Sequence, residues 1–472
     1  MDSHIKHAPL SGRLVMLGFG SIAQASLPLL LRHLDLPPER IEIITADDNG
    51  AEIARAYGVG HRILPLTEHN YREVLEPLIV PGSFVLNLSV GLSSTALIEF
   101  CRARGALYLD TCIQRWPGDD PFGLRTQSER SNYALREEVL ALRGERPAGP
   151  TAVMTMGANP GLASIFVKEA LLRMADDAGI DPPHEAERVA WAKLARTLGI
   201  KAIHVAERDT QLSAQRKQRD EFVNTWSVPG LVTEGLQPAE LGWGTHERHW
   251  PEDAERHCFG CGTAIYLNRP GASTRVRSWT PLEGAYQGFL ITHCESMSIS
   301  DHLTVREAGC VVYRPTVHYA YHPCDDAVLS LHEMAGRGWV PQHRARIIRD
   351  DVVSGMDELG VLLMGNERGV YWFGSRLGIE QARALVPHNN ATSLQVAAGI
   401  LAGTVWAIQH PDAGIVEPDD LGHEDIMRVA RPYLGDVVGV YGDWSPLDGR
   451  GQLFAEDLDR DDPWQFKNLR VC

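Results

Sequence analysis

Residues 14–30, LVMLGFGSIAQASLPLL, constrain the fold of this chain more than any other stretch. An apolar run short enough for a buried strand is followed by Gly18, Gly20 and Ala23, and then by an apolar stretch of helical length. This is the G-x-G-x-x-A fingerprint in the strand–turn–helix setting that a dinucleotide site requires. Gly18 permits the tight turn, Gly20 lets the backbone approach a pyrophosphate, and the small Ala23 lets helix and strand pack closely.

The residues after the glycines predict how a dinucleotide is held. Ser21 and Ile22 begin the expected helix, whose free N–H groups and positive dipole end suit phosphate. An acidic residue at the end of the second strand should bind the adenosine ribose, and the segment IEIITADD supplies Asp47 or Asp48. An acid there favours NAD over NADP, because it would repel a 2′-phosphate. We take Asp47 as the ribose ligand; for one of the two acids, capping of the next helix is the alternative.

Strands and helices alternate through the first third of the chain, which predicts an α/β fold with a doubly wound parallel sheet. Further strands are expected at residues 41–48, 83–90, 107–112 and 151–156, and helices at 49–57, 70–78, 94–104, 131–143 and 162–174. In such sheets, ligands bind beyond the carboxyl ends of the strands. The predicted cofactor-binding residues there are Ser89, Asp110, Thr111, Gly157, Ala158 and Pro160.

The loop Gly157–Gly161, GANPG, follows the last of these strands. Pro160 fixes one backbone angle and disfavours helix at Asn159, while Gly161 is permissive. Asn159 could therefore present its amide to a bound nicotinamide or to a substrate. A turn with an N-cap would use the same residue types, so both interpretations stay open.

The alternation fades from about residue 185, which indicates a second, more antiparallel domain. Strands are expected near residues 205–208, 221–229, 274–278 and 288–298. Residues 389–408 form an apolar helix that should be buried and pack back on the nucleotide domain. The tail 433–472 is expected to form covering loops. We assign 1–156 to a dinucleotide-binding Rossmann domain, 157–385 to an α+β catalytic domain, and 386–472 to the returning C-terminal segment.

Composition excludes several classes of protein. The 472 residues carry a formal net charge of −16, which argues against a nucleic-acid partner. The sequence has neither an apolar run that predicts a bilayer span nor a signal-peptide pattern, so no membrane association is expected. Eight cysteines in so long a chain do not make a disulfide scaffold, which favours the cytoplasm. The lone CxxC at residues 258–261 lacks a second pair at zinc spacing, so no metal is predicted.

Four residues of the second domain are candidates for substrate chemistry: Glu207, Trp226, Glu234 and His293. Each has an ordinary explanation when taken alone. A glutamate at a strand end is usually solvated, a tryptophan is usually in the core, and a histidine among apolar neighbours is usually a satisfied core residue.

Longer motifs link these residues. The chain resembles the bacterial homospermidine synthases, relatives of the saccharopine dehydrogenases, nearly from end to end. The resemblance rests on VMLGFGSIAQASLPLL, LNLSV, MGANPG, NTWSVPGLVTEG, GFLITHCESMSISDHLTV, MDELGVLL and NNATSLQVAAGIL.

The resemblance implies a reaction on tightly held NAD in a homodimeric enzyme. One putrescine is oxidised at a terminal carbon, a second putrescine displaces ammonia, and the retained NADH reduces the new imine to homospermidine. Trp226 is similar to the family's tryptophan that holds a cationic intermediate by a cation–π contact. Glu207 and Glu234 correspond to carboxylates that bind ammonium and move protons, and Asn159 and His293 to polar residues near the reacting centre. We favour Glu207 or Glu234 as the base over His293, whose neighbours are apolar.

The chain departs from the family pattern at two places. Gly91 stands where the family has an acidic residue after LNLSV, and Gln114-Arg115-Trp116 replaces a Glu-Pro-Trp sequence. Losing two carboxylates and gaining Arg115 should weaken binding of a distal ammonium, so another diamine or slow turnover becomes an alternative. Two other functions stay open: reductive amination by an NAD(P)-dependent dehydrogenase like saccharopine or carboxyspermidine dehydrogenase, and a non-catalytic NAD-linked polyamine-binding protein.

Overall fold

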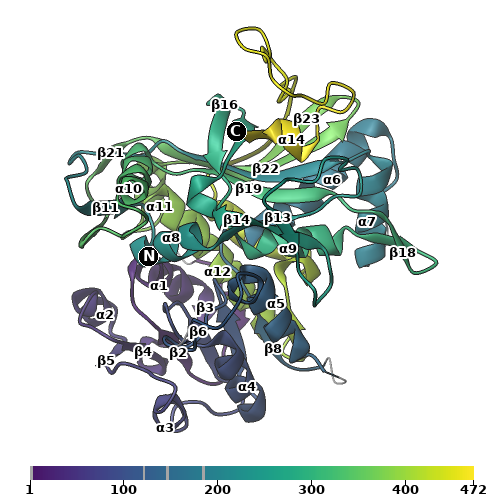
Figure 1. The fold of residues 1–472 in the computed structure, drawn as a ribbon. Helices are drawn as coiled ribbons and strands as arrows, with labels where there is room; N and C mark the ends of the chain where they lie inside the picture. The colour runs from purple at the N-terminus through teal and green to yellow at the C-terminus, as the bar shows by residue number, and fades with distance from the viewer. Residues whose placement is uncertain (1–3, 121–122, 145–147, 183–186, 472) are drawn as a thin grey trace.

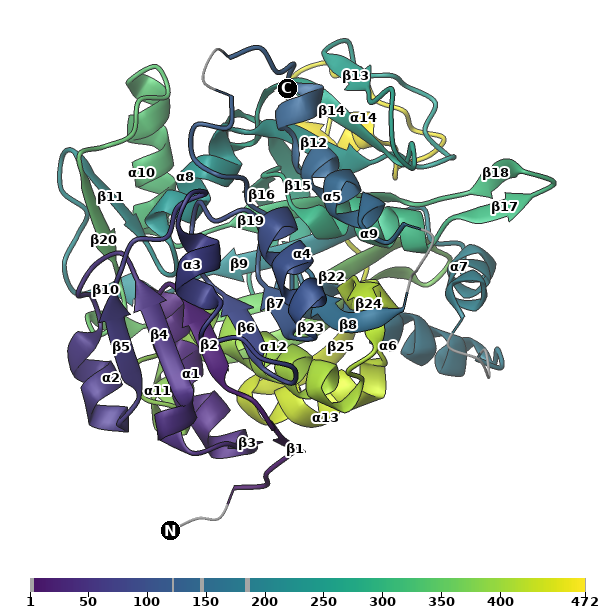
Figure 2. The ribbon, with the colours of Figure 1, turned by 90° about the horizontal axis from the view of Figure 1, so that it is seen from below.

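A computed structural model describes residues 4–120, 123–144, 148–182 and 187–471, which are organised around two large sheets (Figure 1). The N-terminal sheet has seven parallel strands in the described residues, in the order β24-β8-β7-β6-β2-β4-β5, and Figure 2 shows them side by side. When these strands are numbered in chain order and read from β5 to β24, the order is 3-2-1-4-5-6-7, which contains the Rossmann winding, so the predicted doubly wound sheet is confirmed. The strands are β2 (Leu14–Leu17), β4 (Ile41–Thr45), β5 (Gly60–Ile63), β6 (Phe84–Asn87), β7 (Leu107–Asp110), β8 (Gly149–Val153) and β24 (Ala413–Val416).

Helices cover both faces of this sheet, which is why β2 is apolar on both sides. Leu14 and Met16 pack with α1 and α12 on one face, and Val15 and Leu17 pack with α3 and α4 on the other. The helices of this half are α1 (Ser21–His33), α2 (Ala51–Tyr57), α3 (Tyr71–Leu75), α4 (Ser94–Arg104) and α5 (Asn132–Ala141), with a short parallel pair β1 (Ala8–Pro9) and β3 (Leu34–Asp35). The next helix, α6 (Leu162–Ala178), packs on the second sheet.

The second sheet has eleven strands within the described residues and is mixed. Its central strand β9 (Ala202–Asp209) runs parallel to β19 (Thr316–His322) and antiparallel to β22 (Met356–Asn366). The other strands are β12 (Pro238–Gly242), β13 (Ala254–Arg256), β14 (Ala264–Pro270), β15 (Arg275–Thr280), β16 (Gly284–Phe289), β23 (Gly369–Gly378), β25 (Asp436–Gly442) and β26 (Arg470–Val471).

Smaller elements surround this sheet. They are the helices α7 (Arg188–Thr197), α8 (Val228–Leu236), α9 (Cys294–His302), α10 (Asp325–Gly336), α11 (Ile379–Leu385), α13 (His423–Ala430) and α14 (Phe466–Leu469), and the paired strands β10 (Leu212–Ser213) with β21 (Val352–Ser354), β11 (Glu221–Asn224) with β20 (Arg344–Ile347), and β17 (Val305–Glu307) with β18 (Cys310–Tyr313).

Two predicted strands are wrong in part. Residues 221–229 form β11 only to Asn224, and α8 follows because Ser227 caps its N-terminus and a proline occupies its first turn. Residues 288–298 end β16 at Phe289 and then start α9. Short apolar runs do not distinguish a buried strand from a buried helix, which explains both errors.

Helix α12 (Ala391–Gln409) connects the two sheets, since it packs on α1 and β7 and also contacts β22 and β23. A capping box between Asn390 and Ser393 fixes its start. The sequence analysis expected no apolar run of membrane-spanning length, but α12 meets that criterion by its length and composition. Because 89% of that stretch is buried inside the protein, it is a core helix.

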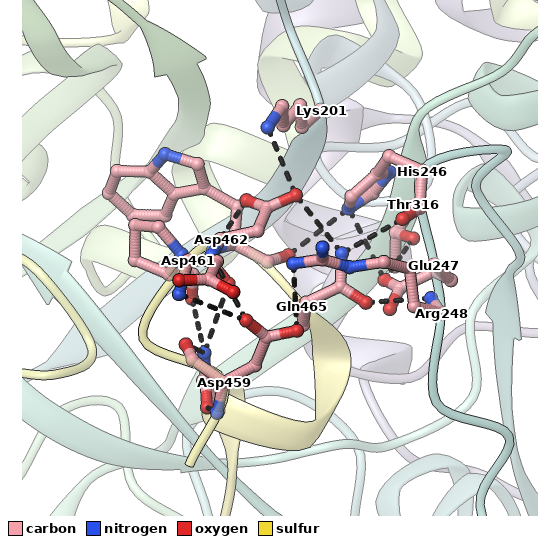
Figure 3. Close-up of polar contacts among 12 residues, drawn as sticks. Lys201, His246, Glu247, Arg248, Thr316, Asp459, Asp461, Asp462 and Gln465 are labelled. Carbon is pink, nitrogen blue, oxygen red and sulfur yellow. Dashed lines mark hydrogen bonds and ion pairs between the residues drawn. The ribbon is translucent and has the colours of Figure 1, made fainter.

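The C-terminal segment contributes to both sheets instead of only covering them. β24 extends the nucleotide sheet beside β8, whereas β25 pairs with β23 and β26 pairs with β15. Figure 3 shows how the tail is held on the second sheet: Asp462 accepts from Lys201 Nζ at 3.0 Å, and Asp459 pairs with Arg248 at 2.8 Å. The buried Glu247 accepts hydrogen bonds from the Thr316 hydroxyl and a tail amide. The predicted loops of the tail are therefore partly ordered elements.

Candidate active site

The glycine turn between β2 and α1 opens into a cavity of about 470 Å³ at the carboxyl ends of the parallel strands. Gly18 has a φ of +83°, and a Cβ there would stand 2.9 Å from the Cα of Ser89. Around Gly20, by contrast, no described atom lies within 4 Å of the position that a Cβ would take. Helix α1 begins at Ser21 without a side-chain cap, so its first N–H groups face this open cradle. The cradle fits a dinucleotide pyrophosphate.

The end of β4 supplies the acidic wall of the same cavity. Asp47 lines it, and its Oδ1 accepts a hydrogen bond of 3.0 Å from the Asn49 amide, which orients the carboxylate. Asp48 is not among the lining residues. The geometry therefore favours Asp47 over Asp48 as the ribose ligand.

A second cavity of about 120 Å³ adjoins the first and shares six lining residues with it, among them Ile22, Ser89 and Trp226. The five residues predicted to be catalytic all line it: Asn159, Glu207, Trp226, Glu234 and His293. Predicted cofactor residues line it as well, namely Thr111, Gly157, Ala158 and Pro160. We call this second cavity the reaction chamber.

Glu207 lies on β9 at the floor of the chamber and is only 1% exposed. Asn159 Nδ2 donates to its Oε2 at 2.6 Å, and the Tyr319 hydroxyl donates to the same oxygen. Burial raises the pKa of Glu207 to about 7, against the lowering effect of these two hydrogen bonds. A carboxyl group with a pKa near neutrality suits both the acceptance and the return of a proton.

His293 lies between two carboxylates at the start of α9. Its Nε2 stands 3.1 Å from Glu234 Oε2, and its Nδ1 stands 3.1 Å from Glu295 Oε1. Burial by itself would lower the pKa of His293, but the two glutamates outweigh it and raise the pKa to about 10. The imidazole is therefore a cation at neutral pH, and a protonated imidazole has no free nitrogen lone pair with which to accept a proton.

Trp226 forms part of the wall that the two cavities share. Its Nε1 donates to the Tyr321 hydroxyl at 3.1 Å, and its backbone carbonyl accepts from the Ser21 hydroxyl at 2.7 Å. The rings of Tyr319 and Tyr321 stack with centroids 5.0 Å apart. Indole and phenol rings beside carboxylates make a site suited to an organic cation.

Asp110 lies outside both cavities, so its predicted role as a cofactor ligand is not supported by its position. It is fully buried, accepts from the Tyr108 hydroxyl at 2.8 Å, and accepts from the Thr155 amide at 2.7 Å. Burial raises the pKa of Asp110 to about 6. Its side chain links β7 to the backbone after β8 instead of reaching into the nucleotide cavity.

The positions that depart from the family pattern lie in different surroundings. Gly91 lines the nucleotide cavity with a φ of +83°, and Gln114 lines the reaction chamber. Arg115 points away from the chamber and pairs with Glu138 and Asp119 on the outside. The structure therefore gives no support to the expectation that Arg115 weakens binding of a substrate ammonium.

Several chamber residues were not singled out from the sequence: Tyr319, Thr392, Val396, Ser227 and Gly230. The only signal for Tyr319 is the aromatic alternation in VHYAYH, which also describes an ordinary buried strand. For metals, no group of three or more His, Cys, Asp or Glu side chains that could hold an ion occurs among the described residues. In the CxxC segment, Cys261 contacts Arg136 and Thr263.

A dinucleotide cradle that shares a wall with a buried chamber of carboxylates and aromatic rings defines the class of saccharopine dehydrogenase-like enzymes. Family models agree: residues 14–153 match the saccharopine dehydrogenase NADP binding domain, and residues 157–443 match the saccharopine dehydrogenase C-terminal domain. Within this class, the chain belongs to the homospermidine synthase family.

Relatives across nearly the whole length support that assignment. The chain is 53% identical to the homospermidine synthase of Blastochloris viridis, over 98% of each protein. It is 47% identical to that of Mesorhizobium japonicum, over 98% of this chain and 97% of the relative. The crystal structure of the Legionella pneumophila homospermidine synthase in complex with NAD is 49% identical, covers 98% of both chains, and superposes with a TM-score of 0.93.

Proposed function

We propose that this protein is an NAD-dependent homospermidine synthase, which condenses two putrescine molecules to sym-homospermidine and releases ammonia. One observation carries the proposal: the nucleotide cavity and the reaction chamber share Ile22, Ser89 and Trp226. A carbon held beside Trp226 therefore lies next to the space for a nicotinamide. The Legionella relative in complex with NAD supports the choice of cofactor.

The residues that would hold NAD are the glycine turn, the start of α1, Asp47 and Ser89. When bound there, NAD supplies a hydride acceptor that can return the hydride later. The side chains of the protein would bind the amines, orient the reacting carbon and move protons.

The charges in the chamber match a diamine. Glu234, the protonated His293 and Glu295 together carry one net negative charge, which can pair with a substrate ammonium. The Trp226 ring can stabilise a cation developing at the reacting nitrogen, a contact worth about 2 kcal/mol when desolvated. Glu207 can take the proton that an ammonium must lose before its carbon gives up hydride.

The chamber also limits access of water to an imine. Glu207, His293 and Tyr319 are buried, and the loop that carries Asn159 closes one side. Excluding water protects the imine from hydrolysis until the second amine attacks. Putrescine as the diamine, assembly as a homodimer and a cytoplasmic location follow from the family resemblance and are part of this proposal.

The test is product analysis after incubating the protein with NAD⁺ and putrescine, with no aldehyde added. The proposal predicts homospermidine and ammonia in equal amounts, without net formation of NADH. A product that appears only with a carbonyl compound and NADH or NADPH would identify a reductive dehydrogenase. Saturable putrescine binding without ammonia release would identify a polyamine-binding protein. Either result would overturn the proposal.

A further inference from the structure

Three carboxyl groups lie on one face of the second sheet, behind the reaction chamber. Glu207 and Asp209 alternate along β9, so their side chains point to the same face. Asp357 on β22 stands directly opposite Asp209 in the antiparallel register, and Leu359 stands opposite Glu207. All three carboxyl groups are buried, yet only Glu207 lines the chamber. The function of Asp357 therefore needs an explanation.

Hydrogen bonds distinguish Asp209 from Asp357. Asp209 accepts from the backbone and side chain of Gln211 at 2.8 and 3.1 Å, and from the Thr225 hydroxyl at 3.0 Å. Asp357 accepts from the Thr392 hydroxyl at 2.6 Å through Oδ2. Its Oδ1 is buried and has no donor among the described residues. Asp209 is thus the better solvated anion of the two.

Asp357 and Glu207 occupy diagonal positions on the same face of neighbouring strands, where long side chains come within reach of each other, and interaction with Glu207 raises the pKa of Asp357. If both were ionised, neither could donate, and two negative charges would face each other in a buried place. A proton on Asp357 converts the contact into a hydrogen bond between a carboxylic acid and a carboxylate. Burial, followed by the charges of Glu207 and Asp209, holds the pKa of Asp357 well above its usual range.

The other titratable groups around the trio come from three elements. Tyr319 and Tyr321 lie on β19, and burial raises the pKa of both phenols, so they stay neutral. Two positive charges act on the trio: His293 lowers the pKa of Glu207, and Arg208 lowers the pKa of Asp209. Neither charge is among the main influences on the pKa of Asp357. Asp357 therefore avoids a buried negative charge by holding a proton.

We propose that Asp357 is a protonated positioning residue whose carboxyl group donates a hydrogen bond to Glu207. This hydrogen bond prepares the Glu207 carboxylate to accept a proton from the substrate and to return it later. The inference rests on the proposed function of Glu207 in the same chamber. The pair holds one proton at rest and two after the substrate ammonium has been deprotonated.

The proton balance of the cycle then closes inside the protein. Glu207 takes a proton from the first alkylammonium, and the neutral amine loses hydride to become an iminium. The proton of the second ammonium leaves with the departing ammonia as ammonium ion. After hydride returns to the new iminium, the secondary amine takes back the proton from Glu207, so no net proton is consumed or released.

The first test compares three variants through the acid limb of the kcat–pH profile, which should lie near pH 7 in the wild type. Asp357→Asn keeps a neutral donor of the same shape, so the limb should stay within about 0.3 pH units and kcat within about threefold. Asp357→Leu removes the donor and should move the limb up by about one pH unit or more. Glu358→Gln changes a buried carboxyl group on the opposite face of β22 and should leave the limb unchanged.

An ionised Asp357 predicts a different result. Removing a negative charge in Asp357→Asn would then lower the pKa of Glu207 and move the limb down by more than one pH unit, which would overturn the inference. Wild-type protein that makes no homospermidine would instead defeat the proposed function.

A second test needs no turnover and remains valid if Asp357→Leu does not fold. Infrared spectra of the wild-type protein at pH 8 should contain a carbonyl band of a buried carboxylic acid that is missing in Asp357→Asn. An unchanged carboxylic acid band in that variant would overturn the inference.

Discussion

The hydroxyl of Ser21 donates a hydrogen bond of 2.7 Å to the backbone carbonyl of Trp226. Ser21 begins the helix that offers its N-terminus to a dinucleotide, and Trp226 precedes the helix that carries Glu234. The bond connects two domains across 205 residues of sequence. The cofactor turn and the proposed cation-binding ring therefore hold each other in place.

Ser21→Ala should uncouple this contact. A neutral hydrogen bond contributes about 1 kcal/mol, so we expect kcat to fall about fivefold as the indole loses its fixed position. The dissociation constant for NAD⁺ should change less, because the backbone N–H of residue 21 remains. Steady-state kinetics and NAD⁺ titration measure the two effects. Ser26→Ala is the control, since that hydroxyl donates to the Ile22 carbonyl within the same helix. Equal losses in both variants would contradict the coupling.

Trp226→Ala should leave NAD bound and reduce homospermidine formation by about thirtyfold or more, as expected for loss of a desolvated cation–π contact of about 2 kcal/mol. Trp226→Phe should keep an intermediate rate, because a phenyl ring retains part of the attraction. Tyr321→Phe removes only the hydrogen-bond partner of the indole and separates that effect from the ring. Undiminished synthesis by Trp226→Ala would refute the role of the ring.

His293 should contribute stability that depends on pH. Its pKa in the folded protein, about 10, lies above the unfolded value near 6.5. The contribution is therefore complete below pH 6.5 and is lost as the pH rises from 6.5 through 10. The free energy of unfolding in urea of the wild type should exceed that of His293→Gln more at pH 6 than at pH 9.5. A difference that widens with pH would show that the imidazole is neutral in the folded protein.

Gln114→Glu should restore a carboxylate to the reaction chamber. A new negative charge beside a bound ammonium in a partly buried site should lower KM for putrescine by about tenfold. Arg115→Met is the matched control: its guanidinium faces Glu138 outside the chamber, so its loss should leave KM unchanged. A KM that rises in Gln114→Glu would place the distal ammonium elsewhere in the chamber.

The nucleotide half of the molecule was largely predictable from the sequence, because its signals are local. The glycine turn, the apolar strands and Ala23 each depend on neighbours in the chain, and they specify the Rossmann winding. The boundaries were less exact: β6 ends at Asn87 instead of continuing to residue 90.

The chemistry of the chamber was not predictable from local patterns. The pKa of Glu207 depends on Tyr319, 112 residues away, and on burial by several elements. His293 had the right residue type, but its charge comes from Glu295, two residues later, and from Glu234, 59 residues earlier, and the second of these contacts is not revealed by any periodicity. Asp110 illustrates the opposite case, because its position after a strand was predicted and its side chain turned inward. Without the structure, only the family resemblance indicated that the chamber residues lie close together.

The central claim is that one hydride leaves a diamine and returns within the same protein. Putrescine deuterated at both terminal carbons, incubated with the protein and NAD⁺ in the presence of excess unlabelled NADH, measures this directly by mass spectrometry of the product. The account predicts homospermidine that retains all of its deuterium. Homospermidine that has exchanged deuterium for hydrogen from the unlabelled pool, or deuterium accumulating in free NADH, would contradict it.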